Sequence, residues 1–169
     1  MTDEDYMRKA LAEAEQAARE DEIPIGAILV CRGRIIARTH NLTETLCDVT
    51  AHAEMQAITA GANALGGKYL TDCTLYVTVE PCPMCAGAIV NARIENLIFG
   101  AYDKKSGCAG SRINLFANNL FNHNVNVIGG VLEKECAAVL TDFFKNLRKI
   151  KKIRKEGLPR FNLSLENPL

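Results

Sequence analysis

The sequence predicts an α/β sandwich in which helices pack on a mixed β-sheet. Segments with strand-like and helix-like hydrophobic spacing alternate along most of the chain, as expected when helices connect the strands of one sheet. About half of the 169 residues are hydrophobic, which is enough for one core, and the chain is too short for two catalytic domains. We therefore expect one domain over residues 1–156 and a terminal tail over residues 157–169.

The first elements are predicted to be a helix and a hairpin. Hydrophobic residues recur at helical spacing between Asp3 and Glu20, with charged residues between them. A continuous apolar run over residues 25–31 is typical of a buried strand. Residues 32–34 have the composition of a turn, and residues 35–38 are the expected partner strand of the hairpin.

A second helix and another strand are expected after a loop. The alanine-rich stretch near residues 51–64 predicts a helix, and Thr50 is its expected N-cap residue. His52 and Glu54 would then lie in the first turn of this helix. Residues 73–79 have the apolar and β-branched composition of a strand.

The last elements end in a long helix. A helix is expected over residues 82–91, followed by strands over residues 94–100 and 125–128. A long helix is predicted from about Glu133 to Ile153. The resulting succession of strands and helices supports the α/β sandwich.

Composition indicates a cytoplasmic protein without a membrane partner. No run approaches the eighteen or so apolar residues that cross a bilayer, and residues 1–5 are acidic where a secretory signal would be basic. The seven cysteines are odd in number, and five of them are scattered in apolar or loop contexts. A reducing compartment explains such free cysteines better than a disulfide framework.

Charge is distributed unevenly along the chain although the net charge is zero. Residues 145–169 contain eight basic and two acidic residues, a net charge of +6, so residues 1–144 carry −6. This basic stripe could bind phosphate groups. It could equally be a solvated helix end whose cations favour the C-terminal dipole. The stripe comprises Lys145, Arg148, Lys149, Lys151, Lys152, Arg154 and Lys155.

A three-ligand metal site is indicated by the motifs over residues 52–54 (His-Ala-Glu) and 81–85 (Pro-Cys-Pro-Met-Cys). A catalytic zinc ion normally has three protein ligands and one open position for water, whereas a structural zinc ion has four. We therefore assign one zinc ion per chain to His52, Cys82 and Cys85. These ligands lie at two predicted helix starts, where the positive dipole end favours thiolates.

A closed structural zinc site is the alternative for this cysteine pair. It would need a fourth ligand from elsewhere in the chain, and no candidate has a paired spacing. The candidates are Cys73, Cys108, His40 and His123.

Glu54 is the expected catalytic residue. Zinc lowers the pKa of bound water from about 15.7 toward 7, and a positioned carboxylate could take the proton and deliver it to the substrate. The alternative is an exposed first-turn glutamate that merely suits the helix dipole.

The two motifs together form the signature of zinc-dependent nucleobase deaminases, and the chain resembles the bacterial tRNA-specific adenosine deaminases over roughly residues 5–150. This resemblance implies a cytidine-deaminase-like fold, a three-layer α/β/α sandwich with a mixed five-stranded sheet, and a homodimer. Residues 112–116 and the tail after Lys155 depart from the family pattern. The similar segments are residues 23–27, 40–41, 50–54, 74–78, 100–111 and 121–123.

The resemblance also implies substrate-binding residues. Asn41 corresponds to a loop asparagine that contacts the nucleoside, and Asp103 to the segment near the target nucleotide's backbone and ribose. Pro81 and Cys82 correspond to the pocket wall, and Ala53 is a further expected substrate-binding residue. Without the resemblance, Asn41 would be interpreted as a turn residue and Asp103 as part of a solvated loop. His40 and His123 are more typical of structural, hydrogen-bonding histidines.

The leading functional hypothesis is hydrolytic conversion of adenosine to inosine at the wobble position of a tRNA anticodon. One alternative is a deaminase of a free base or nucleoside, such as guanine, cytosine or cytidine. Another is a zinc-stabilised nucleic-acid-binding module without catalysis. Basic residues favour the tRNA hypothesis over the free-base alternative. They could anchor the phosphates of an RNA, whereas a small neutral substrate has no phosphates. The expected RNA-binding residues are Lys104, Lys105, Lys145, Arg148, Lys149, Lys151 and Lys152.

Overall fold

Helices and strands alternate in a computed structural model that describes residues 1–157 of the chain, with side chains described through Ile153. Apart from Gly157, the expected tail lies outside the described residues. The elements are α1 (Asp3–Arg19), β1 (Gly26–Cys31), β2 (Arg34–His40), α2 (Ala53–Leu65), β3 (Cys73–Val79), α3 (Pro83–Asn91), β4 (Asn96–Ala101), β5 (Asn126–Ile128) and α4 (Glu133–Gly157).

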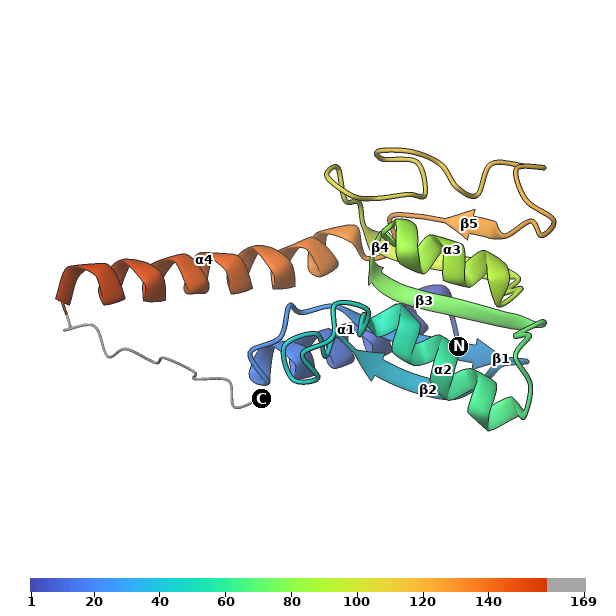
Figure 1. The fold of residues 1–169 in the computed structure, drawn as a ribbon, viewed down its shortest axis with the longest axis horizontal. Helices are drawn as coiled ribbons and strands as arrows, with labels where there is room; N and C mark the ends of the chain where they lie inside the picture. Colours follow the sequence, from blue (N-terminus) through green and yellow to red (C-terminus); the bar gives the residue numbers. More distant parts are fainter. Residues whose placement is uncertain (158–169) are drawn as a thin grey trace, which may run out of the picture.

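The five strands form one mixed sheet in the order β2-β1-β3-β4-β5 (Figure 1). Strand β1 pairs antiparallel with both β2 and β3. Strands β3, β4 and β5 run parallel to one another. The predicted mixed five-stranded sheet is therefore confirmed.

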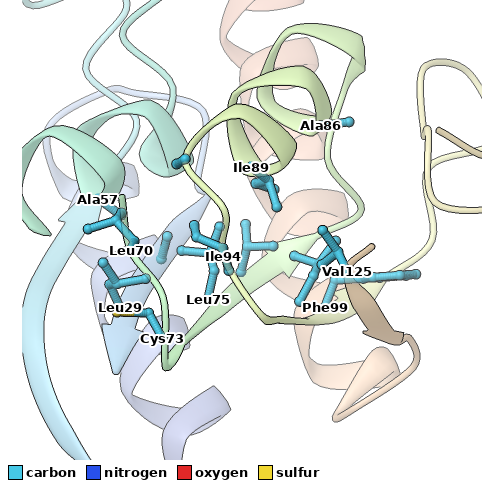
Figure 2. Packing of buried hydrophobic residues seen from close by; sticks show 14 of the residues in the cluster. Leu29, Ala57, Leu70, Cys73, Leu75, Ala86, Ile89, Ile94, Phe99 and Val125 are labelled. Atoms are coloured by element: carbon cyan, nitrogen blue, oxygen red, sulfur yellow. The ribbon is translucent and has the colours of Figure 1, made fainter. Parts of the chain in front are cut away.

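Helices cover both faces of this sheet, because alternate side chains of each strand point to opposite faces. Helices α2 and α3 pack on the face that carries Leu29, Leu75 and Phe99, as the close view in Figure 2 shows. Helices α1 and α4 pack on the opposite face, which carries Ile28 and Tyr76. The three-layer sandwich is thus confirmed.

The connection from β3 through α3 to β4 joins two parallel strands. In such a unit the helix begins beside the carboxyl end of the preceding strand, at the edge where α/β folds place their sites. Three residues separate the end of β3 at Val79 from the start of α3 at Pro83. Cys82 and Cys85 are therefore held at a sheet edge by a short connection.

The expected N-cap of α2 was wrong. The helix begins at Ala53, with His52 at the N-cap position. Thr50 instead forms a turn with Asp48, whose carboxylate accepts hydrogen bonds from the Thr50 backbone N–H at 2.8 Å and from its hydroxyl at 2.7 Å. This local turn competes with capping for the threonine hydroxyl.

Helix α4 is longer than expected, since it continues to Gly157. In Figure 1 its C-terminal part projects beyond the rest of the ribbon. Charged residues interrupt its hydrophobic positions. None of the helices in the described part of the chain is both long and apolar enough to span a membrane.

Candidate active site

His52, Cys82 and Cys85 come together although Cys82 lies thirty positions after His52 in the sequence. The Nδ1 atom of His52 lies 3.6 Å from the sulfur of Cys82 and 3.5 Å from that of Cys85. All three ligand atoms lie within 4.8 Å of one another. One imidazole nitrogen and two sulfurs at this spacing suit a zinc ion.

No further histidine, cysteine or carboxylate of residues 1–153 joins this group. None of the four residues considered as a closing ligand belongs to this group, and the thiol of Cys108 donates to the carbonyl of Ser106 at 3.3 Å. His40 faces Glu20, with 2.9 Å between its Nε2 and the carboxylate, and His123 donates from Nε2 to the carbonyl of Ile94 at 2.7 Å. Cys73 faces its cross-strand neighbour Cys31 in the register of β1 and β3. The described residues thus contain the open, three-ligand arrangement.

Two of the ligands occupy helix N-cap positions. His52 caps α2 and Cys82 caps α3, and neither side chain makes a capping hydrogen bond. The N–H groups of both first turns therefore keep their positive field directed at the ligand group. The nearby Cys85 thiol and His52 imidazole lower the pKa of Cys82 to about 4, so this sulfur is a thiolate at neutral pH.

Glu54 is buried beside the ligand group, with 4% of its surface exposed. Burial raises the pKa of its carboxyl to about 7, although the His52 imidazole opposes this shift. The interpretation as an exposed glutamate that serves only the helix dipole is therefore wrong. A buried carboxyl that is not itself in the ligand group has the chemistry of a proton-transfer residue.

The expected substrate-binding residues lie near the two helix starts. Ala53 is the first residue of α2 and Pro81 precedes the N-cap of α3, and both are buried. Asn41 follows β2, and the next backbone N–H, from Leu42, donates to the carbonyl of Ala51 at 3.0 Å. Asn41 is also buried, and its side-chain amide donates a hydrogen bond to Glu22 at 3.0 Å.

Asp103 has a structural role within its own loop. Its carboxylate accepts hydrogen bonds from the backbone N–H groups of Lys105 at 2.8 Å and Ser106 at 3.2 Å, and from the Ser106 hydroxyl. Burial alone would raise the pKa of Asp103, but these donors hold it below its usual value. The ionised side chain thus shapes the loop that presents Lys104, which is exposed.

Glu80, which the sequence analysis did not identify, ties that loop to the second motif. Its buried carboxylate accepts from the backbone N–H groups of Asp103 at 3.0 Å, Ala109 at 2.9 Å and Ser111 at 3.0 Å. A Cβ atom on Gly107 would lie 2.3 Å from this carboxylate, so only glycine fits there. The available signal was a charged residue between a buried strand and Pro81.

The remaining expected RNA-binding residues are all exposed. Lys105 lies in the same loop as Lys104. The other five lie on the projecting part of α4, which suits either phosphate binding or a solvated helix end (Figure 1). They are Lys145, Arg148, Lys149, Lys151 and Lys152.

Comparison with known proteins agrees with this geometry. Residues 1–148 match the family model of MafB19-like deaminases. The chain is 52% identical to the tRNA-specific adenosine deaminase of Bacillus subtilis, covering 92% of this chain and 97% of that protein. It is 47% identical to the Haemophilus influenzae enzyme of the same name, covering 90% and 89%.

The chain belongs to the tRNA-specific adenosine deaminase family. A solved tRNA:A34 deaminase, studied for A-to-I editing at the wobble position, has a TM-score of 0.78 and 47% identity over 80% of this chain and 99% of that one. Guanine deaminase from Nitrosomonas europaea has a TM-score of 0.74 at 24% identity, with 83% of each chain covered. This second likeness concerns the fold alone.

The hydrogen bonds of Glu80 predict an acid-dependent loss of stability. Burial raises the pKa of this carboxyl, but donors from Ser111, Asp103 and Ala109 outweigh burial and hold the pKa below its usual value. Because the folded pKa is below the unfolded value of about 4.3, the ionised group stabilises the fold above that pH, and the contribution is lost as pH falls through the folded pKa.

Glu80→Gln should therefore destabilise the protein by roughly 1–3 kcal/mol at pH 7, and the difference from the wild type should shrink below about pH 4. Urea unfolding of both proteins between pH 3 and 7 measures this difference. A difference that stays constant over the whole range would show that the charge of Glu80 does not contribute.

Proposed function

We propose that this protein converts adenosine to inosine by hydrolytic deamination at the wobble position of a tRNA anticodon. The observation that carries the proposal is the group of His52, Cys82 and Cys85 with the buried Glu54 beside it, in a chain of the tRNA-specific adenosine deaminase family. The reaction consumes water and releases ammonia, so the site must supply a nucleophile and move protons.

Zinc is the metal that the donor set fits, with one ion per chain held by the same three residues. When bound, zinc supplies a Lewis acid that lowers the pKa of water toward 7. The thiolate character of Cys82 favours this ligand role.

Glu54 is proposed to carry the protons of the reaction. Its buried carboxylate takes one proton from the attacking water and delivers it to a ring nitrogen of the base. It then takes the remaining hydroxyl proton of the tetrahedral adduct and passes it to the departing amine, which leaves as ammonia. Asn41, Ala53 and Pro81 lie around the same helix starts and are proposed to hold the nucleoside. Asp103 is proposed to act beside the ribose and backbone of the target nucleotide.

A tRNA anticodon suits this site because its loop is single-stranded. The target base must leave the stack of bases to reach a buried carboxylate. Unstacking a base costs little free energy in a single-stranded loop. We propose that seven basic residues neutralise phosphates of the RNA, namely Lys104, Lys105, Lys145, Arg148, Lys149, Lys151 and Lys152. We extend the proposal to a homodimer in the cytoplasm, as the family resemblance implies.

This function is tested by incubating the protein separately with a tRNA transcript and with free adenosine, cytidine and guanine. Inosine in the transcript and release of ammonia from it are expected, with little turnover of the free compounds. Efficient turnover of a free base without inosine in the transcript would instead establish a small-molecule deaminase. A protein that binds tRNA but releases no ammonia from any of these compounds would be a binding module.

Metal analysis should find about one zinc ion per chain in the purified protein. Cys85→Ala should lose this zinc, because it leaves only two of the three ligands. The matched control Cys47→Ala changes an exposed cysteine outside the ligand group and should keep the metal. Zinc retained at full occupancy in Cys85→Ala would refute the ligand assignment.

Glu54→Ala should retain zinc and the fold while losing turnover by about 10²-fold or more, the usual contribution of a general acid or base. Single-turnover inosine formation, measured beside metal content and thermal unfolding, separates these effects. Activity within about tenfold of the wild type would contradict the proton-transfer role.

The triple variant Lys149→Ala, Lys151→Ala, Lys152→Ala should weaken tRNA binding and spare zinc binding. Each neutralised phosphate contributes about −0.7 to −0.9 to the slope of log affinity against log salt, so losing three contacts should flatten the slope by about two. Binding measured between 50 and 200 mM salt checks this. Lys134→Ala, at the other end of α4, is the control and should change the slope by less than about one.

A further inference from the structure

Glu22 is a fully buried carboxylate to which the proposed chemistry assigns no role. It lies in the segment between the end of α1 at Arg19 and the start of β1 at Gly26. Acidic side chains are almost never fully buried unless they have partners. The identity of those partners therefore indicates what Glu22 does.

Within the described residues, all of the hydrogen-bond donors to Glu22 come from residues 41–45, the start of the loop after β2. One carboxylate oxygen accepts from the side-chain amide of Asn41 at 3.0 Å and from the backbone N–H of Glu44 at 3.2 Å. The other accepts from the backbone N–H of Thr45 at 2.7 Å. The Thr43 hydroxyl lies 3.5 Å from the first oxygen.

These contacts determine the orientation of the Asn41 amide. Burial by itself raises the pKa of Glu22, but the N–H groups of Thr45 and Glu44 outweigh it, so the group is ionised and can only accept hydrogen bonds. The amide nitrogen of Asn41 must therefore face Glu22, and it also donates to the Thr43 hydroxyl at 3.0 Å. The carboxamide oxygen makes no hydrogen bond within residues 1–153.

The same loop leads directly into the ligand group. The backbone N–H of Leu42 donates to the carbonyl of Ala51 at 3.0 Å, and His52 is the next residue. At the end of β2, the Thr39 hydroxyl donates to the carbonyl of Ala53 at 2.8 Å. A displacement of the segment bound by Glu22 would thus reach both Asn41 and the start of α2.

We propose that Glu22 is a positioning residue of the active site, which holds the loop over residues 41–51 so that the Asn41 side chain is oriented for binding of the target nucleotide. The proposal rests on the proposed function, since Asn41 is assigned there to nucleoside binding. Glu22 itself acts through Asn41 and does not touch the reacting atoms.

A double-mutant cycle tests this dependence. Glu22→Gln keeps the size of the side chain but replaces one acceptor oxygen with an NH₂ group. This group is itself a donor and cannot accept the hydrogen bonds of the donors it faces. It should lower kcat/KM for the tRNA transcript by about tenfold, mainly through KM, because it leaves donors unpaired. Asn41→Ala should have a similar effect, and adding Glu22→Gln to Asn41→Ala should lower kcat/KM by no more than about twofold further.

Glu20→Gln is the matched control. Glu20 lies two residues away and contacts His40, the neighbour of Asn41, from an exposed position. It should leave kcat/KM within about twofold of the wild type, as is usual for surface substitutions. Zinc content verifies that the site of each variant is assembled. Thermal unfolding verifies that each variant is folded at the assay temperature.

Equal effects of Glu22→Gln in the wild-type and Asn41→Ala backgrounds would overturn the proposal, because a general loss of stability acts independently of Asn41. Hydrogen exchange gives a readout without substrate. Amides of residues 41–51 should exchange faster in Glu22→Gln, and those of the Glu80-bound loop over residues 103–111 should not change. Unaltered exchange over residues 41–51 would also overturn it, whereas a wild-type protein inactive on tRNA would refute only the proposed function.

Discussion

The convergence of two helix starts on one group of side chains is the constraint on which the rest of this structure depends. His52 and Cys82 occupy N-cap positions, where serine, threonine, asparagine or aspartate would normally satisfy the first-turn N–H groups. Their side chains instead face each other and Cys85. Neither side chain caps its helix, so the positive ends of α2 and α3 remain available to favour a thiolate and any negative charge that develops nearby.

Two buried carboxylates then hold the loops beside this centre. Glu22 binds the loop after β2, and Glu80 binds the loop after β4. Each accepts several N–H donors, which offsets the cost of burying a charge and leaves the backbone of an irregular segment satisfied. A loop tied to the interior by several hydrogen bonds loses conformational freedom, which suits the proposed binding of a substrate beside the ligand group.

Glu54 differs from these two carboxylates in its chemistry. All three are buried. Donors lower the pKa of Glu22 and Glu80, whereas burial dominates at Glu54 and raises its pKa to about 7. Similar side chains in one small domain therefore serve as fixed anchors in two places and as the proposed proton carrier in the third, and the number of neighbouring donors makes the difference.

The sequence alone predicted the alternation of elements, the proposed ligand set and the proposed role of Glu54, because spacing within a motif is a local property. The resemblance added the five-stranded sheet and Asn41. Only the tertiary structure decided that the two motifs meet, that His52 replaces Thr50 as the N-cap, and that Glu22 and Glu80 bind loops. These facts depend on contacts between residues far apart in the chain, and local periodicity carries no information about such contacts.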